Sequence, residues 1–295
     1  MNKIINKNIT ELVNNTNIKD NSIDCIIADP PYNIGQSFGT YNNDNKSIKE
    51  YIQWCNTWIS ELERVLSISG SGFIYGFDEV LAHISVNIKL PHRWLIWHYT
   101  NKNVVSNNFW QRSHESIIVF WKDKNKRIFN SDFVREPYGD SYLKLKGKVR
   151  KGTIGRFSKS NKETIYNVNE LGAGGRDVIK LPTLAGRAGC KERIYYCNTC
   201  NDIFIGNKNQ HLNHSILEHP TQKPKKLTQK LLMSCMPYSP KELKFSGTVL
   251  IPFAGSGSEC LWATQLGMEF IAGDINPEYV KLGNMLLDKY GKSKV

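Results

Sequence analysis

The segment from 249 to 279, VLIPFAGSGSECLWATQLGMEFIAGDINPEY, constrains the fold of this chain most. An apolar strand pattern leads into a glycine turn, a helical pattern follows, and a second strand pattern ends at Asp274. Two parallel strands joined by a crossover helix need further helices to cover both faces of their sheet. The segment therefore predicts an α/β fold with a mostly parallel sheet.

The same alternation of strand and helix patterns recurs on both sides of a more polar middle. Before the middle, a helix is expected at 48–66, ended by Gly70 and Gly72, with strands at 23–28, 73–75, 92–99 and 115–121. After it, helices are expected at 227–236, 259–266 and 277–290, with strands at 248–251 and 270–272. We therefore predict one sheet with helices on both faces, encoded by 1–122 and 216–295, and an inserted segment at 123–215.

The chain is basic, and its positive charge is concentrated in the inserted segment. It has 39 Lys plus Arg and 27 Asp plus Glu among 295 residues, a formal net charge of +12. Residues 123–215 hold 18 of the basic and nine of the acidic residues, and 141–162 has eight basic residues and no acidic one. Such a segment is typical of a surface that follows a phosphate backbone, so a nucleic-acid partner is expected. The alternative is a solvated basic loop.

Other features of the composition argue against a membrane or secreted protein. No apolar run approaches the roughly 18 residues of a membrane span, and the first residues, MNKIINKNITELVNN, do not resemble a secretory signal. The seven cysteines are odd in number and show no disulfide framework. We expect a cytoplasmic protein with no membrane partner.

The first segment that carries chemistry is IIADPPYNIG, at 26–35. Asp29 and Tyr32 follow directly after an apolar strand, where open α/β sheets bind their ligands. The two prolines fix the backbone and leave the Pro30 carbonyl free to accept a hydrogen bond. Asp29 and this carbonyl suit an amino group with two hydrogens, and the Tyr32 ring suits a stacked base. The alternative is an ordinary turn after a strand.

The second such segment is the glycine turn of 253–257. Gly255 and Gly257 allow a ligand to approach the backbone at a helix start, and Asp274 follows Gly255 at about the spacing of an acid that reaches a ribose. No third glycine follows, so the spacing favours a nucleoside cofactor without a pyrophosphate. The alternative is a tight strand-to-helix turn. The residues assigned to cofactor binding here are Phe253, Gly255, Ser256, Gly257, Asp274 and Asn276.

Three motifs in a fixed order resemble those of a known family. DPPY at 29–32, HPTQKP at 219–224 and PFAGSG at 252–257 are similar to the motifs of amino-group DNA methyltransferases that use S-adenosylmethionine. This order matches the family's beta arrangement, which implies a permuted, Rossmann-like methyltransferase sheet with 123–215 as the target-recognition segment. DPPY rather than SPPY implies adenine N6 as the target, with cytosine N4 as the alternative.

The resemblance also implies roles for individual residues. Asp29, Pro30, Pro31 and Tyr32 would form the catalytic site, Tyr32 stacking on a base flipped out of double-stranded DNA. Phe253 would pack against the cofactor's adenosine, and Asp29 would also border the cofactor. His219, Thr221 and Lys223 would contact its methionine end, with Thr221 and Lys223 at the carboxylate. Relatives often carry an Asp after the first strand, which binds the cofactor at or near its adenine. Asn8 stands near that place here, and we do not count it among the cofactor-binding residues.

A cluster of cysteines and histidines predicts a structural zinc site. Cys197 and Cys200 have the spacing of a zinc knuckle, and His211 and His214 follow. These four are the expected ligands, with Cys190 as the alternative to His214. The site would brace the inserted segment without entering the chemistry. Reduced thiols beside solvent-exposed histidines are the other interpretation.

The wider functional context is also an expectation. The resemblance implies a restriction-modification enzyme acting on double-stranded DNA, with a cognate endonuclease as a candidate partner and a monomeric or homodimeric state. A zinc-braced nucleic-acid-binding protein with an inactive methyltransferase sheet is the alternative from another class. Asn107, Asn108, Trp110 and Gln111 could contact or replace a flipped base. The candidates for base recognition are Arg112, Arg135, Arg156, Arg176 and Arg187.

Overall fold

The computed structural model describes residues 2–14, 18–38, 44–101, 105–152, 154–155, 162–186 and 189–292. Two compact units are present. The larger contains Met1–Phe129 and Asp177–Val295, and the smaller contains Asn130–Arg176. Within the described ranges, no helix combines the length and apolarity needed to cross a membrane.

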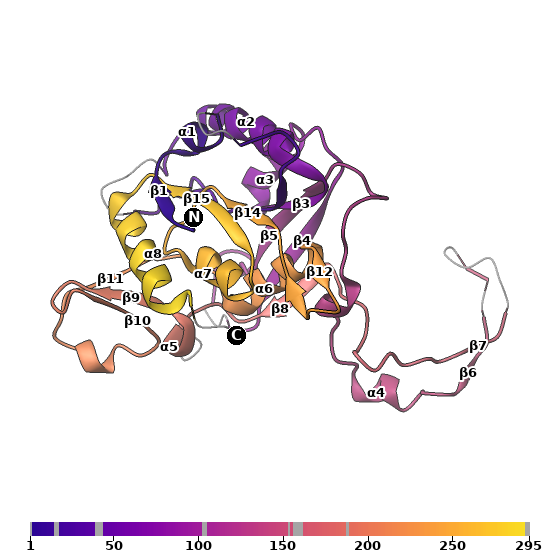
Figure 1. Ribbon diagram of the computed structural model, residues 1–295. Helices are drawn as coiled ribbons and strands as arrows, with labels where there is room; N and C mark the ends of the chain where they lie inside the picture. The colour runs from indigo at the N-terminus through magenta and orange to yellow at the C-terminus, as the bar shows by residue number, and fades with distance from the viewer. Residues whose placement is uncertain are drawn as a thin grey trace. The chain divides into compact units, whose positions relative to one another are not determined.

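An eight-stranded sheet organises the larger unit (Figure 1). Only β5 runs antiparallel to its neighbours, so the predicted mostly parallel α/β sheet is confirmed. In spatial order the strands are β1 (Ile4–Asn6), β15 (Glu269–Asp274), β14 (Thr248–Ile251), β2 (Ile23–Ala28), β3 (Leu66–Gly76), β5 (His114–Trp121), β4 (His92–Tyr99) and β8 (Val178–Leu181).

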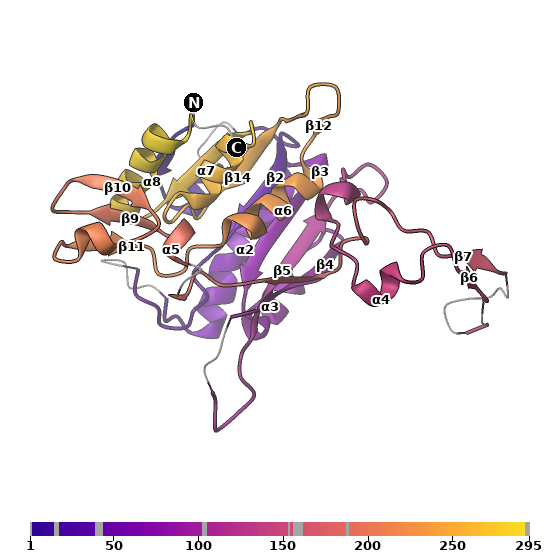
Figure 2. The same cartoon turned by 90° about the horizontal axis from the view of Figure 1, so that it is seen from below.

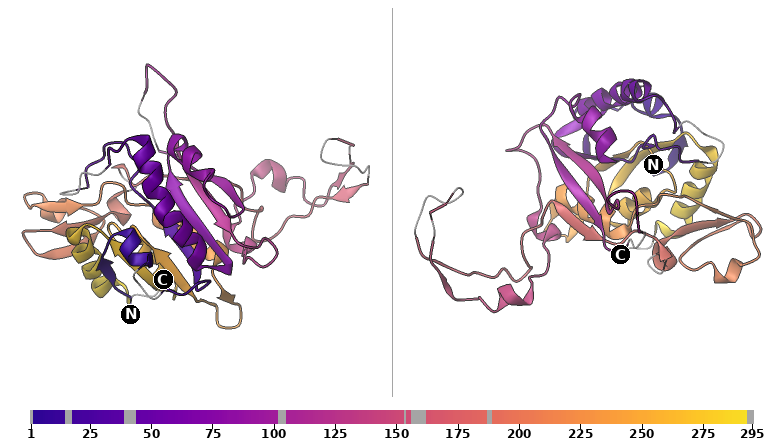
Figure 3. Two further views of the ribbon diagram at one scale, coloured as in Figure 1. Left: turned by 90° about the horizontal axis from the view of Figure 1, so that it is seen from above. Right: turned by 180° about the vertical axis from the view of Figure 1, so that it is seen from behind.

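Helices cover both faces of this sheet. The helices α1 (Ile9–Asn14), α2 (Ile48–Val65) and α3 (Asp78–Ser85) lie on one face, and Figure 3 shows α2 lying over the strands. On the other face lie α6 (Lys225–Cys235), α7 (Ser258–Gln265) and α8 (Pro277–Tyr290). A capping box between Ser47 and Glu50 starts α2, whose buried Trp58 joins Ile26, Ile74 and Phe120 in the main core.

The strand β3 is longer than the sequence pattern predicted. It begins at Leu66, directly after α2, and includes Gly70 and Gly72, which were expected to separate the helix from the strand. A Cβ atom at Gly72 would collide with the ring of Phe120 on the adjacent β5. The glycine therefore admits a large core side chain from a neighbouring strand, a requirement that local sequence does not reveal.

A small antiparallel sheet also belongs to the larger unit. Its strands are β10 (Asp202–Ile205), β9 (Ile194–Cys197) and β11 (Ile216–Glu218), in that spatial order, and α5 (Gly189–Glu192) precedes them. It is joined to α8 by the Lys289 ammonium, 2.8 Å from a carboxylate oxygen of Asp202. A 3-10 helix, η3 (Asn209–His211), lies between β10 and β11, and a hairpin of β12 (Tyr238–Ser239) and β13 (Lys244–Phe245) precedes β14.

The smaller unit holds part of the basic segment. It contains the 3-10 helix η1 (Ser131–Val134), α4 (Asp140–Leu143) and the paired strands β6 (Val149–Arg150) and β7 (Thr164–Ile165). The rings of Tyr138 and Tyr142 stack with centroids 4.8 Å apart. Arg156, Phe157 and Arg187 lie outside the described residues. The expected insert, 123–215, extends beyond this unit to include β8, β9 and β10, and its role in target recognition stays a prediction.

Candidate functional site

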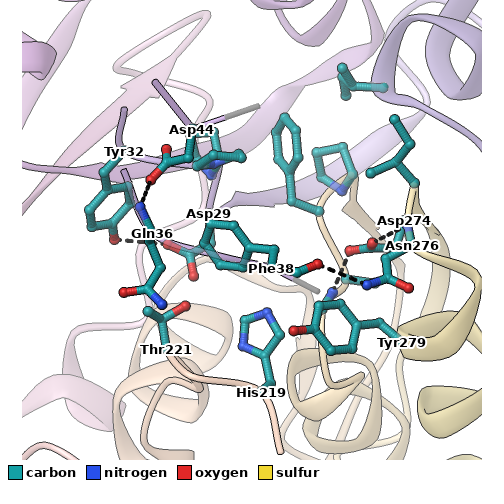
Figure 4. Close-up of a pocket in the computed structure, with 18 of the residues that line it drawn as sticks. Asp29, Tyr32, Gln36, Phe38, Asp44, His219, Thr221, Asp274, Asn276 and Tyr279 are labelled. Carbon is teal, nitrogen blue, oxygen red and sulfur yellow. Dashed lines mark hydrogen bonds between the residues drawn. The ribbon is translucent and has the colours of Figure 1, made fainter. Parts of the chain in front are cut away.

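A cavity of about 480 Å³ lies at the carboxyl ends of the parallel strands, where β2, β14 and β15 finish (Figure 4). All three sequence motifs contribute to its wall, although about 190 residues separate the first motif from the second. The lining residues that the sequence pointed to are Asn8, Asp29, Pro30, Pro31, Tyr32, His219, Thr221, Lys223, Phe253, Gly255, Ser256, Asp274 and Asn276. Gly257 stands just behind them, at the start of α7.

A buried ammonium joins the first motif to the second. The Lys223 side chain is 2% exposed, and its Nζ lies 3.0 Å from Asp29 Oδ1 and 3.2 Å from Glu115 Oε2. It also donates to the Tyr32 hydroxyl at 3.0 Å. The structure therefore places the Lys223 charge between two carboxylates, and its expected contact with the cofactor's carboxylate stays a prediction.

Glu115, which belongs to none of the three sequence motifs, completes this buried cluster. The Tyr99 hydroxyl donates to its Oε1 at 2.6 Å, and the Tyr32 hydroxyl lies 2.7 Å from its Oε2 and 2.8 Å from Asp29 Oδ1. Both Glu115 oxygens are thus engaged within the protein. Among the described residues, no hydrogen bond reaches Asp29 Oδ2 or the Pro30 carbonyl, and these two acceptors remain for a ligand.

Burial and charge set the protonation of this cluster. Burial raises the pKa of Asp29, and the neighbouring Lys223 only partly opposes that effect. Burial also opposes the ionisation of Glu115, but Lys223 and the two tyrosine hydroxyls outweigh it and lower the Glu115 pKa. Burial disfavours the Lys223 ammonium, whereas the two carboxylates favour it and raise its pKa. The pKa values of the two carboxyl groups are therefore shifted in opposite directions, towards the neutral form for Asp29 and towards the charged form for Glu115.

The glycine turn and Asp274 hold each other in place. The Gly255 N–H donates to Asp274 Oδ2 and the Asn276 N–H donates to Asp274 Oδ1, each at 2.8 Å. Asn276 accepts the Glu278 N–H at the start of α8 and donates from Nδ2 to the Phe38 carbonyl at 3.0 Å, as Figure 4 shows. Phe253 packs edge-on against Trp54 and Trp58 below the turn. The turn thus presents a rigid backbone to the cavity.

His219 lies opposite this turn. Its ring contacts Tyr279 with centroids 4.8 Å apart, and Figure 4 shows both rings beside Phe38. Burial, with Lys223 and Arg193 nearby, lowers the pKa of His219 to about 3, so the ring is neutral. Its buried Nδ1 has no hydrogen-bond partner within the part of the chain that the structure describes. A polar atom left unpaired beside a cavity indicates a place for a polar ligand group.

The four predicted metal ligands come together at the edge of the small sheet, at the end of β9, in the turn that follows it and around η3. Their ligand atoms all lie within 4.8 Å of one another. His214 Nδ1 is 3.3 Å from Cys197 Sγ, 3.2 Å from Cys200 Sγ and 3.3 Å from His211 Nδ1. Ligands of tetrahedral zinc are separated by about 3.3–3.8 Å, given Zn–S and Zn–N bonds of about 2.3 and 2.0–2.1 Å. The side chain of Cys190 lies outside the described part of the structure.

Comparison with known proteins gives the family. A family model described as DNA methylase, N6_N4_Mtase, matches residues 23–285. The chain belongs to this N6/N4 DNA methylase family. The match includes all three motifs of the methylase and every strand of its large sheet except β1.

Individual relatives of the methylase agree with this assignment. It is 26% identical over 277 residues to the type II methyltransferase M.HpaI of Haemophilus parainfluenzae, covering 92% of this chain and 70% of that protein. It is 27% identical over 272 residues to the DNA adenine methyltransferase YhdJ of Escherichia coli strain K12, covering 90% and 76%.

Solved structures share the fold of the methylase at low sequence identity. The M1.HpyAVI complex with SAM aligns with a TM-score of 0.56 and 18% identity over 98% of this chain and all of that one. The cytosine-N4-specific PvuII DNA methyltransferase aligns with a TM-score of 0.57 and 13% identity, covering 96% and 86%. As in the predicted permuted arrangement, β2 of the DPPY motif precedes β14 of the glycine motif in the chain, yet the two strands are adjacent and parallel.

The left-handed glycine at the start of α7 yields a prediction about stability. Gly257 has φ +77°, and a Cβ atom there would lie 2.8 Å from Gly283 Cα, where α8 packs against the turn. Gly257→Ala should lower the free energy of unfolding by about 2–4 kcal/mol, from backbone strain plus the collision. Gly35→Ala is the matched control, because φ is +76° but no atom lies within 4 Å. If urea denaturation showed the same loss of unfolding free energy in the two variants, the collision with Gly283 would not be the cause.

Proposed function

We propose that this methylase transfers a methyl group from S-adenosylmethionine to adenine N6 of a flipped-out base in duplex DNA. The observation that carries the proposal is the pair of unengaged acceptors, Asp29 Oδ2 and the Pro30 carbonyl, in the wall of a cavity that also contains the glycine turn. Two acceptors match the two hydrogens of an exocyclic amine.

The charge of the cavity supports this proposal. The chain carries +12, yet its cavity is lined by five carboxylates and only three lysines. A cavity richer in carboxylates favours a cationic cofactor and an amine, whereas the basic remainder of the chain favours a polyanion. The acidic residues are Asp29, Asp44, Glu115, Glu259 and Asp274.

The residues around the glycine turn fit the cofactor. When bound, S-adenosylmethionine supplies a methyl group attached to a sulfonium sulfur. Phe253, Gly255 and Asp274 would hold its nucleoside, and a Cβ atom at Gly255 would lie 2.8 Å from His219 Nε2, so only glycine leaves this space open. The unpaired Nδ1 of His219 and the exposed Thr221 would serve the methionine end.

Asp29 and its neighbours would activate the amine. Its lone pair is delocalised into the base, and hydrogen bonds to Asp29 Oδ2 and the Pro30 carbonyl favour the pyramidal form that can attack. Pro31 holds the frame rigid, and Tyr32 offers its ring to the base. The amine exchanges one proton for the methyl group, and Asp29 is the nearest acceptor for that proton. The protein's contribution is positioning and electrostatics.

The choice of adenine rests on the DPPY sequence and on the adenine methyltransferase YhdJ among the relatives. The cytosine-N4-specific PvuII enzyme shares the fold, so cytosine N4 is the second candidate. Mass spectrometry of nucleosides from DNA treated with the methylase should detect N6-methyl-2′-deoxyadenosine. Detection of N4-methylcytosine alone would establish the second candidate. Absence of any methylated base would favour the alternative of a nucleic-acid-binding protein whose methyltransferase sheet is inactive.

Sequencing of the treated DNA would then give the recognition sequence. A restriction-modification role predicts methylation at one short site, with double-stranded DNA as the substrate and an endonuclease specific for the same site. We assign the choice of site to residues 123–215, and sedimentation would show whether the methylase acts as a monomer or a homodimer.

We further propose a structural zinc ion held by Cys197, Cys200, His211 and His214. The Gln222 amide ties this sheet to the second motif, since its Oε1 accepts the Ile194 N–H at 2.9 Å and its Nε2 donates to the Glu192 carbonyl at 3.0 Å. Bracing of the sheet therefore also supports the wall of the cavity.

The zinc proposal predicts one zinc ion per chain in the purified protein. Chelation should lower Tm by about 5 °C or more, because a structural zinc contributes directly to folding. Chelation should also weaken cofactor binding, because Gln222 of the second motif is held by hydrogen bonds to this sheet. Cys200→Ser should lose zinc, whereas Cys55→Ser on α2 should retain it, as measured by elemental analysis. Equal zinc content in both variants would overturn the assignment.

A further inference from the structure

The connection between β4 and β5 leaves the sheet at the edge where the cavity lies. Asp29 follows Ala28 at the carboxyl end of β2, and Ala28 pairs with Ile74 near the same end of β3. β5 runs the opposite way and enters the sheet at this edge, with Ser116 opposite Gly76. Residues 105–113 therefore extend from the sheet edge that any base must cross to reach Asp29.

The end of this loop is fastened to the wall of the cavity. The Arg112 guanidinium lies 4.1 Å from the centre of the Phe77 ring and forms an ion pair with Glu79 at 2.5 Å. Phe77 lines the cavity and packs edge-on against Tyr32, with centroids 5.1 Å apart. Arg112 is thus engaged within the protein, and it fixes where the preceding residues leave the surface.

Two large aromatic side chains stand in this loop, in contact with solvent. Phe109 is 79% exposed and Trp110 is 88% exposed. Figure 2 shows the loop projecting beyond the ends of β4 and β5. Exposure of adjacent aromatic rings to water is unfavourable in free energy, so such rings indicate a surface that a partner covers.

We propose that Phe109 and Trp110 form a wedge that enters the base stack of duplex DNA as the target base turns into the cavity. The proposal rests on the proposed function, because a base can reach Asp29 only after it leaves the duplex. Removal of the base opens a gap between its neighbours, and a planar ring filling that gap replaces the lost stacking.

Duplex DNA suits this loop better than a second copy of the chain. Residues 105–113 contain no acidic side chain, and the protein as a whole carries +12. The net positive charge of the protein opposes the approach of a second copy, whereas it attracts a phosphate backbone. The loop also shares its sheet edge with the cavity, so DNA that delivers a base there lies beside Phe109 and Trp110.

The test compares the Phe109→Ala/Trp110→Ala double variant with the parent on two oligonucleotide duplexes. Both carry the recognition sequence found by sequencing, and in one the target base stands opposite an abasic site. On the matched duplex, kcat/KM should fall about 10- to 100-fold, the range of lost base–aromatic stacking. On the abasic duplex the loss should be within about threefold, because that base is already unpaired. Val86→Ala, 81% exposed after α3, is the control and should match the parent on both.

The outcomes separate the wedge from other roles. Equal losses on both duplexes would overturn it and make the loop part of the reaction site. No loss on the matched duplex would also overturn it. A changed sedimentation coefficient with an unchanged preference between the duplexes would assign the rings to a second copy instead. Absence of methylation by the parent would refute the proposed function, independently of the wedge.

Discussion

The Asp29→Ala variant should lose at least about 10³-fold in kcat while it still binds cofactor and DNA. Asp29 supplies one of the two unengaged acceptors in the cavity, and no other carboxylate of the cluster can replace it, because both oxygens of Glu115 are already bonded. Truncation leaves the glycine turn and Asp274 intact. The loss should therefore fall on the chemical step.

Single-turnover kinetics and calorimetric titration of the cofactor would test this separation. Asp288→Ala, which removes an exposed carboxylate from α8, is the control and should keep the parent's rate. Unchanged methylation by the Asp29→Ala variant would remove the catalytic assignment. Parallel loss of cofactor binding would show that Asp29 serves the cofactor rather than the amine.

Lys223→Met should produce the second large effect. Removal of the ammonium leaves Asp29 and Glu115 as neighbouring buried carboxylates without a counter-ion. The uncompensated charge should destabilise the fold by about 3–5 kcal/mol and lower kcat about 10²-fold at neutral pH, because Asp29 becomes protonated. Urea denaturation and the pH dependence of kcat would measure the two effects.

The dependence of kcat on pH should move in opposite directions in two variants of the cluster. In the proposed mechanism the reaction needs ionised Asp29, so the rate should fall as the pH falls through the Asp29 pKa, which burial already raises. Lys223 lowers that pKa, so Lys223→Met should move the acid limb to higher pH. Glu115 raises it, so Glu115→Gln, which keeps the shape, should move the acid limb to lower pH. Shifts in the same direction would contradict the proposed electrostatic cluster, and the Glu115 variant keeps the test open if Lys223→Met does not fold.

Much of the fold follows from local sequence patterns. The strands at β2, β4, β5 and β14 and the helices α2 and α8 have the expected positions, because periodicity and caps act over a few residues. The short edge strands β1 and β8 were not expected. Each is at most four residues long, and its strand character comes from pairing with β15 or β4 rather than from its own composition.

Sequence patterns alone selected most of the reactive groups of the site, but not Glu115 or Tyr99. DPPY and the glycine turn each follow a strand, and a parallel sheet brings the carboxyl ends of its strands to one edge, where Asp29 and Gly255 both line the cavity. Cys197, Cys200, His211 and His214 were likewise selected by spacing, and their ligand atoms meet.

The pairing of the buried charges depends on contacts that form only in three dimensions. Glu115 stands in an apolar strand with no motif around it, and its partners Lys223, Tyr32 and Tyr99 come from three separate parts of the chain. The side-chain partners of a buried charge depend on strand order and distance in space, which local patterns do not encode. For the same reason the sequence could not show that the Lys223 ammonium lies against Asp29. A buried ammonium stays charged only when it is paired, and the Asp29 carboxylate provides that partner.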